Sequence, residues 1–217
     1  MAMKSSPEIE KIRKKLNEYY GSLGWWPAET PFEVCIGAIL TQNTSWSNVE
    51  KAIENLKKEG LLSCDRICEV DLPVLAELIK PSGYFNQKAR KLKAFCEFLR
   101  ENYSCNLESF FKSGNTEELR EKLLSIWGIG KETADSILLY AGEKAIFVVD
   151  AYTRRIFSRH GICDNSIEYD ELRNLVENSI EKSNADYNEF HAALVYVGKD
   201  FCKKKNPLCD FCPLKDL

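Results

Sequence analysis

Near the middle of the chain, residues 119–140 read LREKLLSIWGIGKETADSILLY. Apolar residues three and four apart predict an amphipathic helix from Leu119 to Trp127, and a second helix is expected from Lys131 to Tyr140. Gly128-Ile129-Gly130 between them forms a tight turn in which backbone N–H groups can approach an anion. An ordinary helical hairpin closed by a glycine cap is the alternative for this pattern.

Helical spacing continues on both sides of this hairpin. The other apolar-faced segments are Ile9–Leu16, Phe32–Leu40, Val49–Leu56, Leu72–Leu78, Ala89–Leu99, Arg155–Arg159, Tyr169–Ile180 and Asn188–Val197. Residues 145–149, AIFVV, resemble a strand but have no partner, so we expect a buried extended link. These patterns predict an all-α fold of about ten helices with short turns.

Composition places the chain among ordinary globular proteins. It has 217 residues, of which 44% are hydrophobic, enough for one domain or two small ones. No apolar signal segment opens the sequence and no apolar run approaches 18 residues, which predicts a soluble intracellular protein without a membrane partner. Six of the nine cysteines are scattered and are expected to be reduced thiols: Cys35, Cys64, Cys68, Cys96, Cys105 and Cys163.

The net charge of −3 conceals an uneven distribution. Residues 162–190 contain eight acidic and two basic side chains, and the remainder contains 28 basic and 25 acidic ones. One face can therefore be basic while another is acidic. Net charge alone does not exclude a nucleic-acid partner.

A carboxylate follows the hairpin. About twenty residues after Gly130, the buried-looking Phe147-Val148-Val149 precedes Asp150. This order resembles the helix–hairpin–helix DNA glycosylase superfamily in its endonuclease III-like branch, as do ILTQNT at 39–44, GYFNQKA at 83–89 and the terminal cysteines. The resemblance implies a monomer that binds duplex DNA containing a damaged base, with backbone contacts from the hairpin residues Gly128, Ile129, Gly130, Lys131 and Thr133.

The same resemblance implies a domain organisation. Residues 29–141 would form a six-helix subdomain that carries the hairpin. Residues 1–28 and 142–217 would form a terminal helical subdomain with the cysteines, and the active site would lie in the cleft between the two subdomains. The protein is then expected in the cytoplasm, associated with DNA.

Two acidic residues are candidates for the chemistry. Asp150 can be the N-cap of the helix that follows. The resemblance implies that it can also orient water and stabilise the positive charge that develops on deoxyribose as the C1′–N bond breaks, and that both roles can hold together. Glu132 stands where strand-nicking members of the family carry a Schiff-base lysine, and a carboxylate cannot form that adduct. The alternative for Glu132 is an exposed acid that complements the helix dipole.

Aromatic residues near the N-terminal end are candidates for a base pocket. Trp25-Trp26-Pro27 and Trp46 can serve as packing residues, or as flat surfaces for a flipped, positively charged alkylated base. With GIGKE and VVD they resemble the 3-methyladenine DNA glycosylase III branch, in which the matching residues hold the base. The resemblance also implies that Gln42 fills the gap left by the flipped nucleotide, whereas a helix-end hydrogen bond to backbone is the alternative.

The last cysteines have their own spacing. The spacing Cys202-x6-Cys209-x2-Cys212 matches the first three positions of a pattern in this family, Cys-x6-Cys-x2-Cys-x5-Cys. In the family this pattern holds a [4Fe–4S] cluster, which the resemblance therefore implies here. The fourth cysteine would be residue 218, which follows Leu217. Zinc or inert thiols are the alternatives. The well-known members of the 3-methyladenine branch lack these cysteines. The adjacent lysines, Lys199 and Lys203–Lys205, are expected at DNA phosphates or as a solvated run.

These observations together predict a monofunctional DNA glycosylase that hydrolyses the N-glycosidic bond of alkylated purines, with 3-methyladenine as the first expected substrate. A glycosylase with lyase activity on oxidised pyrimidines or mismatched bases is one rival. A non-catalytic DNA-binding module is the other.

Overall fold

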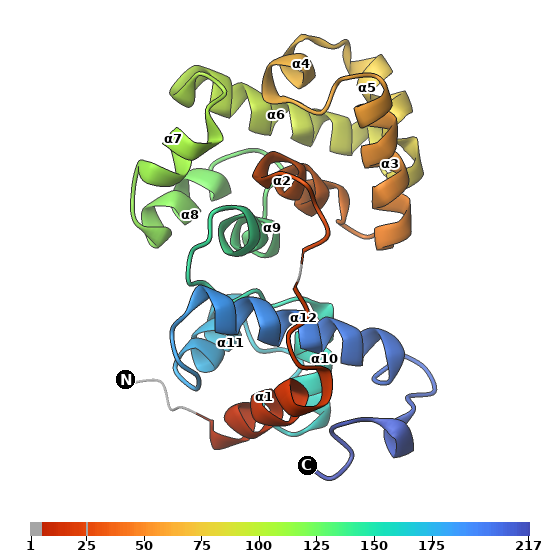
Figure 1. Cartoon of the computed structure of the whole chain (residues 1–217), viewed down its shortest axis with the longest axis vertical. Coiled ribbons are helices and arrows are strands. Elements are labelled where there is room, and N and C mark those ends of the chain that lie inside the picture. The colour runs from red at the N-terminus through yellow and green to blue at the C-terminus, as the bar shows by residue number, and fades with distance from the viewer. Residues whose placement is uncertain (1–5, 25) are drawn as a thin grey trace. The chain divides into compact units, whose positions relative to one another are not determined.

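The computed structural model describes residues 6–24 and 26–217 (Figure 1). Throughout this described part the regular elements are helices, so the expected all-α fold is confirmed. The α-helices are α1 (Pro7–Tyr20), α2 (Pro31–Leu40), α3 (Trp46–Lys58), α4 (Cys64–Glu69), α5 (Leu72–Leu78), α6 (Phe85–Tyr103), α7 (Leu107–Lys112), α8 (Thr116–Leu124), α9 (Lys131–Ser136), α10 (Ala151–Arg159), α11 (Tyr169–Glu177) and α12 (Asn184–Asp200). Of the helices described, none has the length and apolar character needed to cross a membrane.

The chain divides into two compact units, Pro27–Glu143 and Met1–Trp26 together with Lys144–Leu217. In the first unit α2 is the central helix, because every residue from Glu33 to Leu40 is buried. It packs against α3, α6, α9 and the π turn Ile137–Ala141 that continues α9. A helix that is apolar on all sides requires this complete enclosure.

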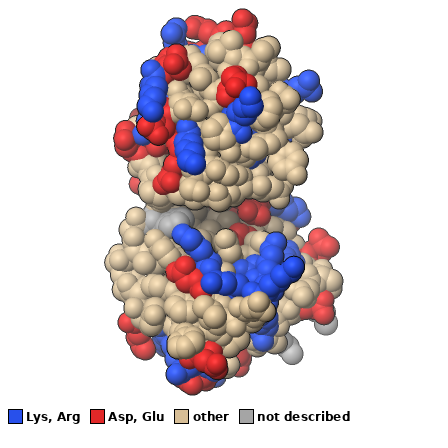
Figure 2. Space-filling view, turned by 90° about the vertical axis from the view of Figure 1, so that its right-hand side faces the viewer, with Lys and Arg blue, Asp and Glu red and all other residues tan. Residues whose placement is uncertain are grey.

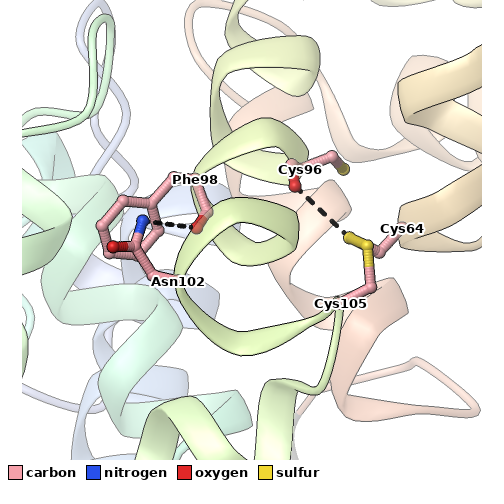
Figure 3. Close-up of a disulfide and its surroundings, with 5 residues drawn as sticks. All are labelled: Cys64, Cys96, Phe98, Asn102 and Cys105. Atoms are coloured by element: carbon pink, nitrogen blue, oxygen red, sulfur yellow. Dashed lines mark hydrogen bonds between the residues drawn. A yellow bond between two sulfur atoms is a disulfide. The ribbon is translucent and has the colours of Figure 1, made fainter.

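A disulfide joins two parts of the first unit. Cys64, the first residue of α4, is bonded to Cys105, which follows the end of α6 (Figure 3). Ser104 and Cys105 both have positive φ, 50° and 58°, and this turn directs the chain back toward α4. The expectation that all six scattered cysteines are reduced thiols is therefore wrong for this pair.

The second unit is built on an extended core segment. Residues 145–149 form no strand, and the four from Ile146 to Val149 are at most 2% exposed, as the sequence predicted. The Phe147 ring packs against the rings of Tyr187 and Phe190 on α12. Helices α10 and α12 make close contact. A Cβ at Gly198 would lie 2.3 Å from Cδ1 of Tyr152, so this position of α12 must be glycine.

Candidate active site

The hairpin turn has the geometry that its glycines allow. Gly128 has φ of +85°, which an L side chain rarely adopts, and a Cβ there would lie 2.5 Å from Cγ of Lys91. Ile129 is 5% exposed and anchors the turn in the core. Gly130 precedes α9 in an extended conformation with open space around its Cα. The backbone at Gly130 is therefore accessible to a ligand.

A buried ion pair fixes the two hairpin helices to each other. Arg120 on α8 donates from Nε to Oδ1 of Asp135 on α9 at 2.6 Å, and from Nη2 to Oδ2 at 3.3 Å. The two side chains are 9% and 0% exposed. Both helices are thus held in register beneath the turn.

Gln42 lies against the hairpin. Its Nε2 donates to the carbonyl oxygen of Gly128 at 3.3 Å and to Oγ1 of Thr133 at 3.0 Å. Its Oε1 accepts a hydrogen bond from Nζ of Lys91. The Gln42 amide therefore makes hydrogen bonds to backbone and side chains of the hairpin, including the backbone contact that was one of its two expected roles.

Two lysines of α6 were missed by sequence reasoning. Besides Lys91, the buried Lys88 donates from Nζ to the carbonyl oxygens of Leu40 at 2.8 Å and Ser82 at 2.6 Å. Burial lowers the pKa of Lys88 to about 8. Lys88 thereby fixes the end of α2, two residues before Gln42. Their three-residue spacing puts both lysines on one helix face, which is the signal that could have found them.

The first three residues of α9 differ in their exposure to solvent. Lys131 and Glu132 are exposed in the first turn of α9, and Thr133 is buried. The Glu132 carbonyl accepts from Oγ of Ser136 at 2.7 Å. Glu132 is therefore a first-turn acid on an accessible surface.

Asp150 has a defined geometry in the second unit. It is the N-cap of α10, and its Oδ1 accepts from the N–H of Thr153 at 2.7 Å. Its Oδ2 lies 3.7 Å from Nε2 of His191 on α12. Burial lowers the pKa of the His191 imidazole, and the Asp150 charge opposes part of that shift. The expected capping role is present, and His191, one of only two histidines in the sequence, was missed.

The aromatic candidates are described only in part. Trp25 lies outside the described residues. Trp26 is half-buried and Pro27 is exposed. Trp46, at the start of α3, is half-buried, and its indole Nε1 donates to Oε1 of Glu50 at 2.8 Å.

The terminal cysteines lie in the loop after α12. Nη1 of Arg159 donates to Sγ of Cys202 at 3.2 Å, and the N–H of Leu214 donates to Sγ of Cys212 at 3.5 Å. Burial raises the pKa of the Cys212 thiol, the Leu214 N–H opposes this, and negative charge on Cys202 and Cys209 adds to it. Soft sulfur ligands with N–H donors around them are suited to an iron–sulfur group.

A different trio of sulfurs is the tightest one among the residues that the structure covers. The sulfur atoms of Cys64, Cys68 and Cys105 all lie within 4.8 Å of one another, and the terminal cysteines do not form such a group. The terminal loop is instead fixed through arginine. Arg155 donates to the carbonyl oxygens of Cys202 and Gly198.

Exposed lysines continue along the terminal loop. Lys199 and Lys203–Lys205 are all exposed. Figure 2 shows Lys and Arg side chains gathered on one face of the unit that contains both termini. This charge is available to a polyanion despite the net negative total.

Comparison with known proteins gives consistent matches. Residues 36–182 match the HhH-GPD family, described as HhH-GPD superfamily base excision DNA repair protein. A Methanocaldococcus jannaschii protein whose name assigns it to the DNA repair glycosylases is 52% identical over 208 residues, covering 96% of this chain and 94% of its own. Endonuclease III of Sulfolobus acidocaldarius is 30% identical over 210 residues, covering 96% and 90%.

Solved structures match over nearly the whole chain. The crystal structure of Helicobacter pylori 3-methyladenine DNA glycosylase bound to 1,N6-ethenoadenine has a TM-score of 0.78 at 33% identity, covering 90% of this chain and 98% of its own. A non-covalent endonuclease III–DNA complex has a TM-score of 0.82 at 21% identity, covering 97% and 94%. The latter likeness concerns the fold alone.

Proposed function

The chain belongs to the HhH-GPD superfamily of base excision DNA repair proteins, and from this premise we propose that it is a monofunctional DNA glycosylase for alkylated purines, 3-methyladenine first among them. That it is a DNA N-glycosylase follows from the family and from the names of its relatives. The absence of lyase activity and the choice of lesion are the parts that need a test.

Glu132 is the observation that carries the proposal. A glycosylase that also nicks the strand needs an amine to form a Schiff base with the sugar. Position 132 places an exposed carboxylate in the first turn of α9, and a carboxylate cannot form that bond. The carboxylate at this position therefore supports hydrolysis by water, which leaves an abasic site.

Asp150 supplies the charge that hydrolysis requires. As the C1′–N bond breaks, the bonding electrons leave with the base and positive charge develops on the sugar. The Asp150 carboxylate would stabilise that charge and orient the water whose oxygen bonds to C1′, while the water proton passes to the carboxylate or to solvent. An alkylated base already carries positive charge and leaves as a neutral molecule, so it does not require a general acid.

The choice of lesion rests on similarity and on aromatic residues. The H. pylori enzyme, 33% identical, is described as a 3-methyladenine DNA glycosylase and is bound to 1,N6-ethenoadenine. We expect Trp25, Trp26, Pro27 and Trp46 to contact the flipped base through their flat faces, to which a cationic ring is attracted. Gln42 is assigned to the gap in the duplex, and the hairpin backbone to a phosphate.

The spacing of the terminal cysteines favours a cluster, although the structure does not bring their three sulfur atoms together. Cys202, Cys209 and Cys212 would hold a [4Fe–4S] group, with the N–H donors of Arg159 and Leu214 stabilising the thiolates. Bound there, the cluster would serve to cross-link the loop that carries the exposed lysines. Iron and sulfide analysis of the purified protein tests this assignment, and zinc in their place would contradict it.

The decisive experiment identifies released bases. Wild type and Asp150→Asn are incubated with methylated duplex DNA, and the free bases are separated by chromatography. We expect 3-methyladenine from the wild type and a loss of about 10²–10⁴-fold in the variant, the range for one acid–base group. A borohydride-trapped adduct would instead establish a lyase, and DNA binding without any base release in either protein would establish a non-catalytic module.

A further inference from the structure

Three sulfur atoms converge in the Pro27–Glu143 unit, independently of the proposed activity. Cys64 and Cys68 stand four residues apart in α4 and share one face of that helix. Cys105 approaches Cys64 from the turn after α6 (Figure 3). The sulfur atoms of Cys64, Cys68 and Cys105 all lie within 4.8 Å of one another. We propose that, when the Cys64–Cys105 disulfide is reduced, these three sulfurs bind a soft divalent cation such as zinc.

The spacing of the three residues suits thiolate coordination. A tetrahedral zinc site has Zn–S bonds of about 2.3 Å, which places its sulfur atoms about 3.8 Å apart. The Cα atoms of Cys64 and Cys105 are 5.6 Å apart, so side-chain rotation alone can separate the two sulfurs to that distance. The fourth position of such a site would be open to water or to another small ligand.

The surroundings of Cys68 supply charge for a thiolate site. Nζ of Lys93 donates to the Cys68 carbonyl at 2.8 Å. Three thiolates and one divalent cation carry a net charge of −1, and the ammonium group of Lys93 lies beside the backbone of one of the three ligands.

Access to the sulfurs comes from one side. Cys64 and Cys68 are 5% and 9% exposed, whereas Cys105 is half-buried and open to solvent. The carbonyl oxygen of Cys96 lies 3.4 Å from Sγ of Cys64. A cation would therefore enter past Cys105 into a site that is otherwise closed.

The steps balance with a dithiol reductant. The reductant transfers two electrons and two protons to the Cys64–Cys105 bond and becomes a cyclic disulfide. The two thiols formed in this way and the free thiol of Cys68 then release three protons as they bind the cation. Because disulfide and metal join the same two segments, α4 would remain tied to the end of α6 in both redox conditions.

Protection from alkylation tests the site directly. The full-length protein is reduced with a dithiol, freed of reductant and treated with an alkylating reagent, with and without Zn²⁺, and each cysteine is followed by peptide mass spectrometry. Zn²⁺ should protect Cys64, Cys68 and Cys105 together. Half-buried Cys163, in the other unit, should show no change and serves as the internal control.

A matched pair of variants identifies the third ligand. Cys68→Ser should weaken protection of Cys64 and Cys105 so that at least a hundredfold more Zn²⁺ is required, while Cys163→Ser should match wild type. If Zn²⁺ protects none of the three, or Cys68→Ser binds as wild type does, the proposal fails. It also fails if the disulfide resists the dithiol, because the pair is then a cross-link only.

Discussion

Arg120 offers the sharpest test of how the hairpin is held. Arg120→Met retains the long alkyl stem but removes the guanidinium that makes two hydrogen bonds to Asp135. The Asp135 side chain is fully buried, so the substitution takes the Arg120 charge and both of its hydrogen bonds away from a buried carboxylate. Removing one partner of a buried pair costs about 3–5 kcal/mol in free energy of unfolding.

Urea unfolding followed by circular dichroism measures this cost. With a urea dependence of about 2 kcal/mol per molar, the expected loss lowers the unfolding midpoint by about 1.5–2.5 M. Because the chain has two compact units, the change should appear in the transition that involves Pro27–Glu143.

Two further variants make the result specific. Arg120→Met with Asp135→Leu removes both charges and should recover most of the lost stability, since replacing a buried pair with apolar residues is often neutral. Lys58→Met breaks an exposed ion pair with Glu54 and should leave the midpoint unchanged. A loss below about 1 kcal/mol for Arg120→Met, or a double variant less stable than the single one, would refute the reasoning.

Further predictions concern the turn and two buried basic groups. Gly128→Ala should lower the free energy of unfolding by about 1–2 kcal/mol, because φ is +85° and the new Cβ would meet Lys91. Gly130→Ala should leave the stability in urea unchanged but weaken binding to abasic duplex DNA, measured by fluorescence anisotropy. Equal affinity of this variant and wild type would contradict a contact between the turn and a phosphate. Burial lowers the Lys88 pKa to about 8, so between about pH 8 and 10.5 the unfolded chain binds more protons than the folded one. The free energy of unfolding should therefore rise with pH over this range. Lys88→Met should remove that slope. Burial also lowers the His191 pKa, so stability should fall as pH drops below about 6.5, and an equal slope in His191→Gln would contradict this assignment.

The turn of the hairpin could be predicted from the sequence, but the long-range hydrogen bonds of the side chains that pack against it could not. Gly128-Ile129-Gly130 between two apolar-faced segments specifies a helix–turn–helix through neighbouring residues alone. Lys91 reaches Gln42 across 49 residues. Contacts at this separation depend on how α6 packs beside α2, and a single sequence carries no local signal for that packing.

The pairing of the cysteines also could not be predicted from the sequence. Spacing separated the terminal three from the scattered six, because ligands of one group follow one another closely in a short loop. Cys64 and Cys105 are 41 residues apart, and their pairing depends on the left-handed turn at Ser104 and Cys105 that ends α6. Neither residue type is typical of positive φ, so no sequence signal indicated that turn.

The two roles expected for Asp150 are compatible because they can use different atoms of its carboxylate. Oδ1 accepts the hydrogen bond from Thr153 that starts α10, while Oδ2 lies on the side of His191. A carboxylate has lone pairs enough for both, so capping does not consume the charge that hydrolysis requires. Asparagine is as good an N-cap as aspartate. Asp150→Asn should therefore retain α10 and the stability of the protein while base release is lost, and a variant that loses both would show that the side chain acts through the fold.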